Sequence, residues 1–285
     1  MRWRLRFRTA PAGPAPFRFA VVGDSGDGSP QARALARRIR AGRPDFLVHL
    51  GDMAYTHGNA EEFAHRFFGP YRRLLARVPI FPTPGNHDIA HQDVYARVFA
   101  PIPGMESPRL TYSFDWAGTH LVSLRYRYFG MDDTAWLTAD LAAASALRWR
   151  FVFLHEPVYP ASHKRVATGL RARLEPLLEA ADVALLLAGH QHVYARSEPA
   201  CEHVPGAQLV QLTSGGGGAS LDRATPSANF ARVASVTHYL RVSVTPDALV
   251  VRAIGLGGHV IDRLRRRRGA PVPCRSGGWP EPLEG

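Results

Sequence analysis

The sequence predicts an α/β protein in which parallel strands carry polar side chains to one edge of a sheet. Residues 17–52 read as an apolar strand, an amphipathic helix and a second apolar strand. Such a unit places its two strands parallel and side by side. Both strands end in Gly-Asp, so Asp24 and Asp52 are expected at the carboxyl edge of the sheet, where open α/β folds place their sites.

Each element predicted in the first 52 residues has its own sequence pattern. The first ten residues alternate apolar side chains with arginine, which predicts a strand, and APAGPAP at 10–16 predicts a linker. FRFAVVGD (17–24) and DFLVHLGD (45–52) predict buried strands. The helix between them, PQARALARRIRAG, has proline near its start and glycine at its end, which are typical positions for both residues.

The rest of the chain predicts further helices and strands, with no internal repeat. Helices are expected at 60–78, 134–149 and 169–183, with Pro176 kinking or breaking the last of them. Strands are expected at 79–84, 150–157 and 184–192, with a hairpin at 110–127 and β structure with glycine-rich turns in the C-terminal third.

Composition excludes some classes of protein and leaves others open. The chain has 285 residues, of which 46% are hydrophobic, enough for a sizeable core, and no apolar run reaches membrane-spanning length. The net charge is +11, and Lys164 is the single lysine. This excess either favours an anionic partner or reflects an arginine-rich, solvated surface. The densest run, RLRRRR at 263–268, lacks interleaved aromatic residues, which argues against nucleic-acid binding by base stacking.

Five predicted strands end in groups that can bind a metal or move a proton. They are Asp24, Asp52, Asn86 with His87, His155, and His190 with His192. Capping or an ordinary polar contact would explain one such residue, but not five at one edge. The set contains more ligand groups than one four-coordinate ion can bind, and it suits two ions that share a bridging carboxylate. It contains no thiolate, which favours Fe, Mn or Zn.

The motifs around these residues resemble the calcineurin-like metallophosphoesterase superfamily. The motifs are GD-x-G (23–26), GD-x-x-Y (51–55), GNHD (85–88), H-x-P (155–157) and GHQH (189–192), and the resemblance extends from about residue 17 to 262. It implies a four-layer α/β/β/α sandwich of two mixed sheets flanked by helices. Most branches begin with Asp-x-His, where this chain has Gly26. Purple acid phosphatases instead have a tyrosine three residues after the second aspartate, and Tyr55 stands there, so the resemblance is to purple acid phosphatases and their bacterial relatives.

The resemblance also implies a role for each residue. It implies Fe(III) bound by Asp24, Tyr55 and His192, a second ion of Fe, Zn or Mn bound by Asn86, His155 and His190, and Asp52 bridging the two. His87 and His163 would face the substrate phosphate or protonate the leaving group. His57 is either a substrate contact or a solvated loop residue. The family more often has GNHE than the GNHD of this chain.

The expected activity is that of a two-metal phosphoester hydrolase in which metal-bound hydroxide attacks in line. A phosphomonoesterase is the first hypothesis, and a phosphodiesterase acting on nucleotides or lipid head groups is the alternative. A third hypothesis is a non-catalytic binder of nucleic acid or anionic surfaces built on an inactive enzyme fold. The first two place a phosphorylated small molecule in the site.

The resemblance bears on domains and location as well. Larger members carry an N-terminal fibronectin-like domain that ends in a strand and a proline-rich linker, and residues 1–16 resemble that ending. We therefore expect a remnant strand and linker before a single catalytic domain at 17–285. MRWRLRFRTA has no apolar segment and predicts no signal peptide, yet an extracytoplasmic or secreted location is expected for the full-length protein. Cys201 and Cys274 fit no zinc motif, and are either one disulfide or two unrelated thiols.

Overall fold

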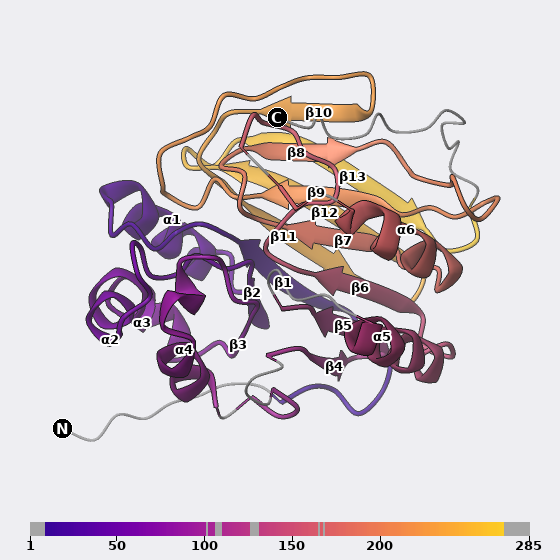
Figure 1. Cartoon of the computed structure of the whole chain (residues 1–285), viewed down its shortest axis with the longest axis horizontal. Coiled ribbons are helices and arrows are strands. Elements are labelled where there is room, and N and C mark those ends of the chain that lie inside the picture. Colours follow the sequence, from indigo (N-terminus) through magenta and orange to yellow (C-terminus); the bar gives the residue numbers. More distant parts are fainter. Residues whose placement is uncertain are drawn as a thin grey trace.

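Two mixed β-sheets form the centre of the fold in the computed structural model (Figure 1). The structure describes residues 9–100, 102–105, 110–125, 131–164, 166–167 and 169–270, with side chains described from 133 onward in the helix that begins at 131. The first sheet has the order β13-β12-β11-β1-β2-β3. Its strands are β1 (Phe17–Val22), β2 (Phe46–His49), β3 (Ile80–Pro82), β11 (His238–Val244), β12 (Ala248–Gly255) and β13 (Val260–Arg267).

The second sheet has the order β10-β8-β9-β7-β6-β5-β4. Its strands are β4 (Tyr112–Trp116), β5 (Thr119–Ser123), β6 (Trp149–Phe153), β7 (Leu185–Ala188), β8 (Tyr194–Ser197), β9 (Val210–Ser214) and β10 (Phe230–Ala234). In each sheet a parallel group, β1-β2-β3 or β5-β6-β7-β9, is bordered by antiparallel strands. The predicted β-α-β unit is confirmed, because β1 and β2 pair in parallel.

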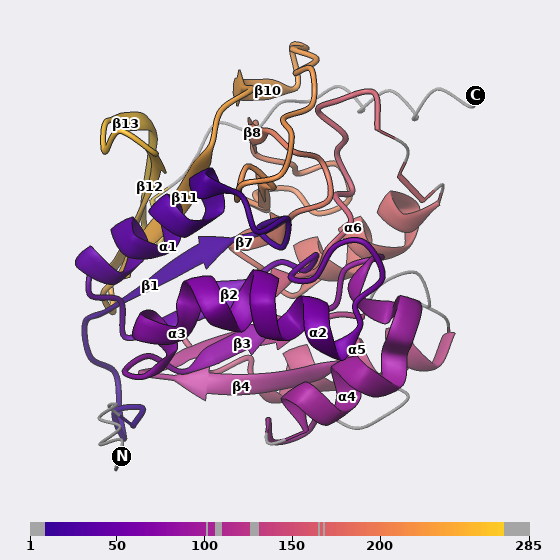
Figure 2. The same cartoon turned by 90° about the vertical axis from the view of Figure 1, so that its left-hand side faces the viewer.

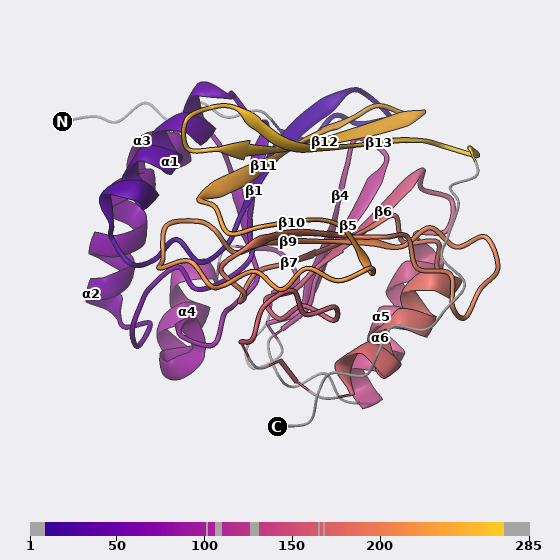
Figure 3. The same cartoon turned by 90° about the horizontal axis from the view of Figure 1, so that it is seen from above.

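Helices flank the two sheets, as the four-layer fold class predicts. They are α1 (Pro30–Ala41), α2 (Ala60–Glu62), a π-helical segment (Phe63–Phe68), α3 (Gly69–Leu75), a 3-10 turn (Asp88–His91), α4 (Gln92–Phe99), α5 (Met131–Ala143) and α6 (Leu170–Ala180). Figures 2 and 3 show α1 and α3 on the side of the first sheet, and α5 and α6 beyond the second. None of the helices in the described ranges is long and apolar enough to cross a membrane.

Aromatic side chains fill the space between the sheets. The rings of Phe19 and Phe46, on adjacent strands of the first sheet, stack with centroids 4.8 Å apart. Phe46 also contacts Trp116 of the second sheet at 4.7 Å, and Phe19 lies 6.1 Å from Phe151. Both phenylalanines are fully buried, and each such burial contributes about 2 kcal/mol to stability. The packed aromatic layer fixes the sheets against one another and so fixes the strand ends that carry the polar residues.

Helix α1 follows the first strand and has its apolar side on the core. Ser29 caps its N-terminus by accepting a hydrogen bond from the backbone N–H of Ala32 at 3.1 Å, and Pro30 occupies the first turn. Leu35 and Ile39, four residues apart, are completely buried. The arginines of the helix therefore face outward.

The described residues differ from the sequence predictions at a few places. Helix α6 continues through Pro176, because the buried Leu174 and Leu178 pack on the second sheet and offset the missing hydrogen bond. Helix α4 was not predicted, although its buried Tyr95 and Phe99 have helical spacing. The strand predicted at 1–10 lies almost entirely outside the described residues.

One of the two cysteines falls within the described ranges. Cys201 is disulfide-bonded. Cys274 lies outside the described residues.

Candidate metal centre

The predicted polar residues meet where the parallel strands of both sheets end. Asp24 follows β1, Asp52 follows β2, Asn86 and His87 follow β3, His155 follows β6, and His190 and His192 follow β7. Asp24, Asp52 and His155 are completely buried and offer ligand atoms within 4.8 Å of one another. The sheets thus contribute side chains to one shared centre.

Local backbone geometry turns these side chains inward. Asp24, Asp52 and His190 have φ angles of 58°, 55° and 64°, a left-handed conformation that non-glycine residues adopt rarely. Strain of this kind persists where packing over-determines it, commonly at functional sites. A Cβ at Gly85 would come within 3.0 Å of the Asp52 carboxylate, so glycine before Asn86 lets the two strand ends touch.

Three side chains form the first group of converging donors. The Tyr55 hydroxyl lies 3.3 Å from Asp24 Oδ1 and 3.2 Å from His192 Nε2. His192 Nε2 lies 3.3 Å from the same Asp24 oxygen. His192 Nδ1 donates to the Ser220 carbonyl at 2.6 Å, which leaves Nε2 as its ligand atom. A phenol oxygen, a carboxylate oxygen and an imidazole nitrogen therefore face one point.

A second group lies beside the first. Asn86 Oδ1 is 3.1 Å from His155 Nε2 and 3.1 Å from His190 Nδ1. His155 Nδ1 donates to the Leu50 carbonyl at 2.6 Å, so its Nε2 is also directed into the centre. An amide oxygen with two imidazole nitrogens suits a divalent transition metal.

Asp52 contacts the second group and shares the interior with the first. Its Oδ1 accepts a hydrogen bond from the His87 backbone N–H at 3.0 Å. Its Oδ2 lies 3.5 Å from His155 Nε2, and this buried oxygen has no hydrogen-bond partner among the described residues. An unsatisfied buried carboxylate oxygen is costly, and a cation would satisfy it. The donor set and this oxygen fit a metal centre.

The pKa values show how strongly the carboxylates and imidazoles interact. Burial would raise the pKa of Asp52, but the charge of His155 holds it well below its usual range. Burial opposes protonation of His155, yet the Asp52 charge raises the pKa of this imidazole to about 9. Burial and the charges of Asp24 and Asp52 raise the pKa of Tyr55 well above its usual value. Protons on imidazoles thus balance the buried carboxylates when no cation does, and a bound metal would displace them.

Asp88, the last residue of GNHD, links two of the motif loops. Its buried carboxylate accepts hydrogen bonds from the backbone N–H groups of Met53, Ala54 and Gly85 at 2.8, 3.1 and 2.9 Å. Burial and the charge of Asp52 raise the pKa of Asp88 to about 7. Asp88 therefore has a structural role that the sequence did not reveal.

Gly26 brings the loop of Tyr55 against the loop of Asp24. Its N–H donates to the Asp52 carbonyl at 3.1 Å, and its carbonyl accepts from the Tyr55 N–H at 3.1 Å. A Cβ on Gly26 would come within 3.0 Å of the backbone of Met53, closer than real Cβ atoms approach. No side chain fits at this position while the Tyr55 loop is in place.

The remaining predicted residues lie at the mouth of the centre or outside it. His87 Nδ1 donates to the Thr56 carbonyl at 2.7 Å, and its Nε2 lies 4.0 Å from Asp52 Oδ2, with 28% of the side chain exposed. His57 is exposed, and its backbone N–H donates to Glu62 at 2.9 Å. His163 is also exposed, and no described contact joins its side chain to the centre.

Lys164, the neighbour of His163, reaches the centre although the sequence did not predict it. Its Nζ donates to the His190 carbonyl at 2.6 Å and lies 3.2 Å from His192 Nε2. The Lys164 carbonyl accepts from the Gln191 side chain at 3.0 Å, which anchors this segment to the GHQH loop. The one signal in the sequence was that this is the single lysine in an arginine-rich chain.

Comparisons with known proteins agree with the motifs. The family model described as calcineurin-like phosphoesterase matches residues 17–194. Purple acid phosphatase 21 of Arabidopsis thaliana is 32% identical over 211 residues, covering 68% of this chain and 47% of that protein. Acid phosphatase type 7 of Danio rerio is 27% identical, covering 65% of this chain and 49% of that protein. The chain thus spans about half the length of these curated relatives.

Solved structures share the fold at low sequence identity. Purple acid phosphatase PPD1 from yellow lupin (Lupinus luteus) has a TM-score of 0.79 at 17% identity, covering 91% of this chain and 55% of that chain. GAP50, described as the anchor in the inner membrane complex of Plasmodium, has a TM-score of 0.72 at 18% identity, covering 88% of this chain and 89% of that chain. With the family model matching more than half of its length, the chain belongs to the calcineurin-like phosphoesterase family, and purple acid phosphatases are among its relatives.

Proposed function

We propose that this protein is a two-metal hydrolase of phosphomonoesters. Asp24, Tyr55 and His192 would hold one ion, Asn86, His155 and His190 the other, and Asp52 both. The observation that carries this most directly is the buried Asp52 Oδ2, which accepts no hydrogen bond among the described residues, at a centre with two groups of donors. Two bound cations supply a nucleophile at neutral pH and neutralise the charge of the phosphate.

The donor types support a particular pair of metals. The first group contains the Tyr55 hydroxyl. As a phenolate, this oxygen is a hard, anionic ligand, which suits Fe(III). The second group is an amide oxygen with two imidazoles and suits Fe, Zn or Mn. We propose Fe(III) beside Tyr55 and one of those three metals beside Asn86.

Side chains at the mouth would bind and orient the substrate phosphate. The hydrogen bond from His87 Nδ1 to Thr56 fixes its ring, so Nε2 is available to a phosphate oxygen or to the leaving oxygen. The ammonium of Lys164 is a further donor close to both groups of proposed ligands. His163 and His57 are exposed and would reach only a substrate that extends to the protein surface.

The names of the curated relatives favour a monoester over a diester substrate, because they are phosphatases. We expect the metal-loaded protein to hydrolyse p-nitrophenyl phosphate at least tenfold faster than bis(p-nitrophenyl) phosphate. A chelator should abolish the activity, and added metal should restore it. Faster cleavage of the diester would favour the phosphodiesterase alternative. No turnover with either substrate in the metal-loaded protein would favour a non-catalytic binder, because the shared fold by itself does not establish catalysis.

An extracytoplasmic location is part of the same proposal. The disulfide bond of Cys201 supports it, since structural disulfides persist in oxidising compartments. The curated plant relatives carry no location in their names, so this disulfide is the main support.

Lys164 allows a direct test of phosphate binding, because it is the single lysine of the chain. We expect a limiting dose of acetic anhydride to acetylate Lys164 in the metal-loaded protein, and orthophosphate to protect it about tenfold. Mass spectrometry of the peptide that contains residue 164 measures the modification. The N-terminal amine reacts in the same tube and serves as an internal control that phosphate should not affect. Equal labelling of Lys164 with and without phosphate would show that its ammonium does not contact the bound anion.

A further inference from the structure

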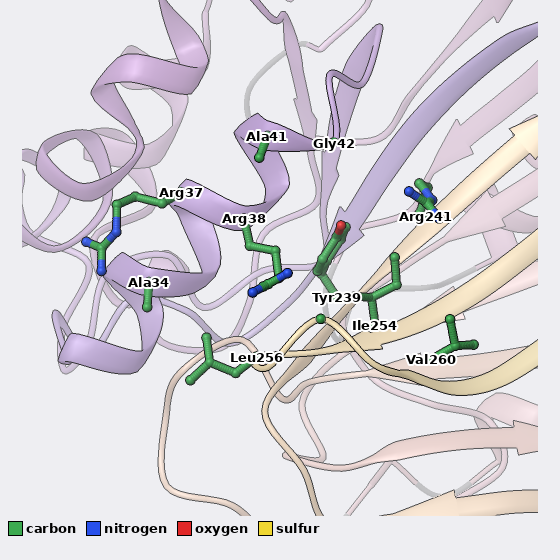
Figure 4. Close-up of a pocket in the computed structure, with 11 residues that line it drawn as sticks. Ala34, Arg37, Arg38, Ala41, Gly42, Tyr239, Arg241, Ile254, Leu256 and Val260 are labelled. Carbon is green, nitrogen blue, oxygen red and sulfur yellow. The ribbon is translucent and has the colours of Figure 1, made fainter.

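A groove of about 610 Å³ lies between α1 and the antiparallel strands of the first sheet (Figure 4). Arg37 and Arg38 of the helix line one side, and Tyr239 and Arg241 of β11 line the other. Figure 4 shows Arg38 reaching from the helix toward Tyr239. None of the residues that line this groove belongs to the metal centre, so it is a separate feature of the surface.

Arginines on the sheet extend the positive charge beyond the groove. Arg241, Arg252 and Arg263 lie directly opposite one another on β11, β12 and β13. Like charges in this cross-strand arrangement destabilise a sheet. Burial and the neighbouring charges of Arg263, Arg241 and Arg18 lower the pKa of Arg252, which shows that the ladder is electrostatically strained.

Nothing acidic compensates this charge on the elements concerned. Helix α1, β11 and β12 contain no acidic residue. Asp262 of β13 is directed elsewhere, because its carboxylate accepts from Arg196 and from the Tyr194 hydroxyl, both at 2.7 Å. In the part of the chain that the structure describes, no ion pair includes any of the five arginines of the groove and ladder. They are Arg37, Arg38, Arg241, Arg252 and Arg263.

An arginine-rich composition does not explain this arrangement. On other faces of the same chain, exposed arginines have acidic partners, such as Arg97 with Asp93 at 2.9 Å and Arg148 with Asp247 at 3.2 Å. A smaller groove on the other side of α1, of about 280 Å³, is again lined by arginines and by no acidic residue. Several arginines without an acidic partner among the described residues therefore gather around α1 and β11–β13.

We propose that the groove binds a small anion carrying two or more phosphate groups. Guanidinium groups match phosphate oxygens in a bidentate geometry, and the groove has three arginines in its lining, of which Arg38 is directed toward Tyr239 (Figure 4). The volume lies within the usual range for small-molecule sites. Ile254 and Leu256 add apolar surface, and Tyr239 is the single aromatic residue of the lining, which disfavours a platform for stacked bases. This binding does not depend on hydrolysis at the metal centre.

The test uses methylenediphosphonate, whose P–C–P bridge is not hydrolysed, titrated calorimetrically into the metal-loaded protein. We expect two sites, one at the metal centre and one in the groove. The Asp52→Asn variant should lose the first and keep the second. The double variant Arg38→Gln/Arg241→Gln should keep the first and bind at the second at least tenfold more weakly, with unchanged hydrolysis of p-nitrophenyl phosphate.

A matched control removes the same charge elsewhere. Arg97→Gln/Arg148→Gln should leave both sites intact, because exposed ion pairs contribute little to stability. Removing Arg241 relieves repulsion, so the groove variant should melt no lower than wild type. If it does melt lower, the variant Arg38→Lys/Arg241→Lys replaces it in the test. This variant keeps the positive charge but loses the bidentate guanidinium donors, and we expect it to bind methylenediphosphonate more weakly than wild type.

Three results would overturn the inference. They are the absence of any site that survives Asp52→Asn, a second site that survives the groove variant, and a second site lost equally in the control variant. Anionic lipid vesicles and single-stranded DNA are tested in parallel. Binding to vesicles or to DNA without binding of methylenediphosphonate would contradict a small-anion site and identify a membrane or nucleic-acid surface instead.

Discussion

The Asp52→Asn variant is expected to lose phosphomonoester hydrolysis almost completely. Its carboxylate is buried beside both groups of donors, and its Oδ2 accepts no hydrogen bond among the described residues, with His155 Nε2 3.5 Å away. The amide keeps the shape but loses the negative charge that Asp52 would offer to both proposed ions. The resulting loss of about 4 kcal/mol of transition-state stabilisation corresponds to about a thousandfold in rate.

Elemental analysis distinguishes loss of metal from loss of the fold. Wild type should contain two metal ions per chain, one of them iron, and Asp52→Asn should contain fewer. Asp27→Asn is the matched control, because Asp27 follows the first motif and accepts from the Ser29 N–H at 3.0 Å, a contact that an amide oxygen can also make. Wild-type turnover by Asp52→Asn would refute a bridging role. Wild-type protein that contains metal but no iron would refute the assignment of Fe(III).

Much of the candidate centre was predictable because most of its polar residues follow an apolar strand, whereas Tyr55 came from the family resemblance. A parallel strand buried on both faces reads as an apolar run, and the first polar residue after it marks the carboxyl edge. Asp24, Asp52 and His155 were recognisable in this way. In the second sheet, β6 and β7 pair in parallel with each other and with β5 and β9. Their carboxyl ends, which carry His155 and His190, therefore lie at one edge of that sheet.

Other parts depend on contacts that no local pattern encodes. Lys164 is directed inward because Gln191 and Asp222, far along the chain, hold its segment through the Lys164 carbonyl and Ser162. Aspartate is typical of exposed loops, yet Asp88 is buried, and its carboxylate accepts hydrogen bonds from the N–H groups of a loop more than thirty residues earlier. The basic groove likewise forms only when α1 and β11, some two hundred residues apart, lie side by side.

Gly26→Ala is expected to damage both stability and the centre, although it adds a single methyl group. The new Cβ would overlap the backbone of Met53, so the two loops must separate. Overpacking of this kind costs about 3 kcal/mol, which lowers the melting temperature by roughly 5–10 °C in a chain of this size. Gly13→Ala is the control, because nothing lies within 4 Å of a Cβ at that position.

The displaced loop carries Tyr55, so the same variant should also lose the visible absorption of a tyrosinate bound to iron. Tyr55→Phe should lose that absorption without a comparable fall in melting temperature, since only a hydroxyl is removed. Gly26→His, which introduces the histidine typical of other branches, should not restore activity to Tyr55→Phe, because the imidazole has no space while the Tyr55 loop is in place. Recovery of metal and turnover in that double variant would show that the loop moves freely and that glycine at 26 is not required by packing. Normal absorption and melting in Gly26→Ala would lead to the same conclusion by a simpler measurement.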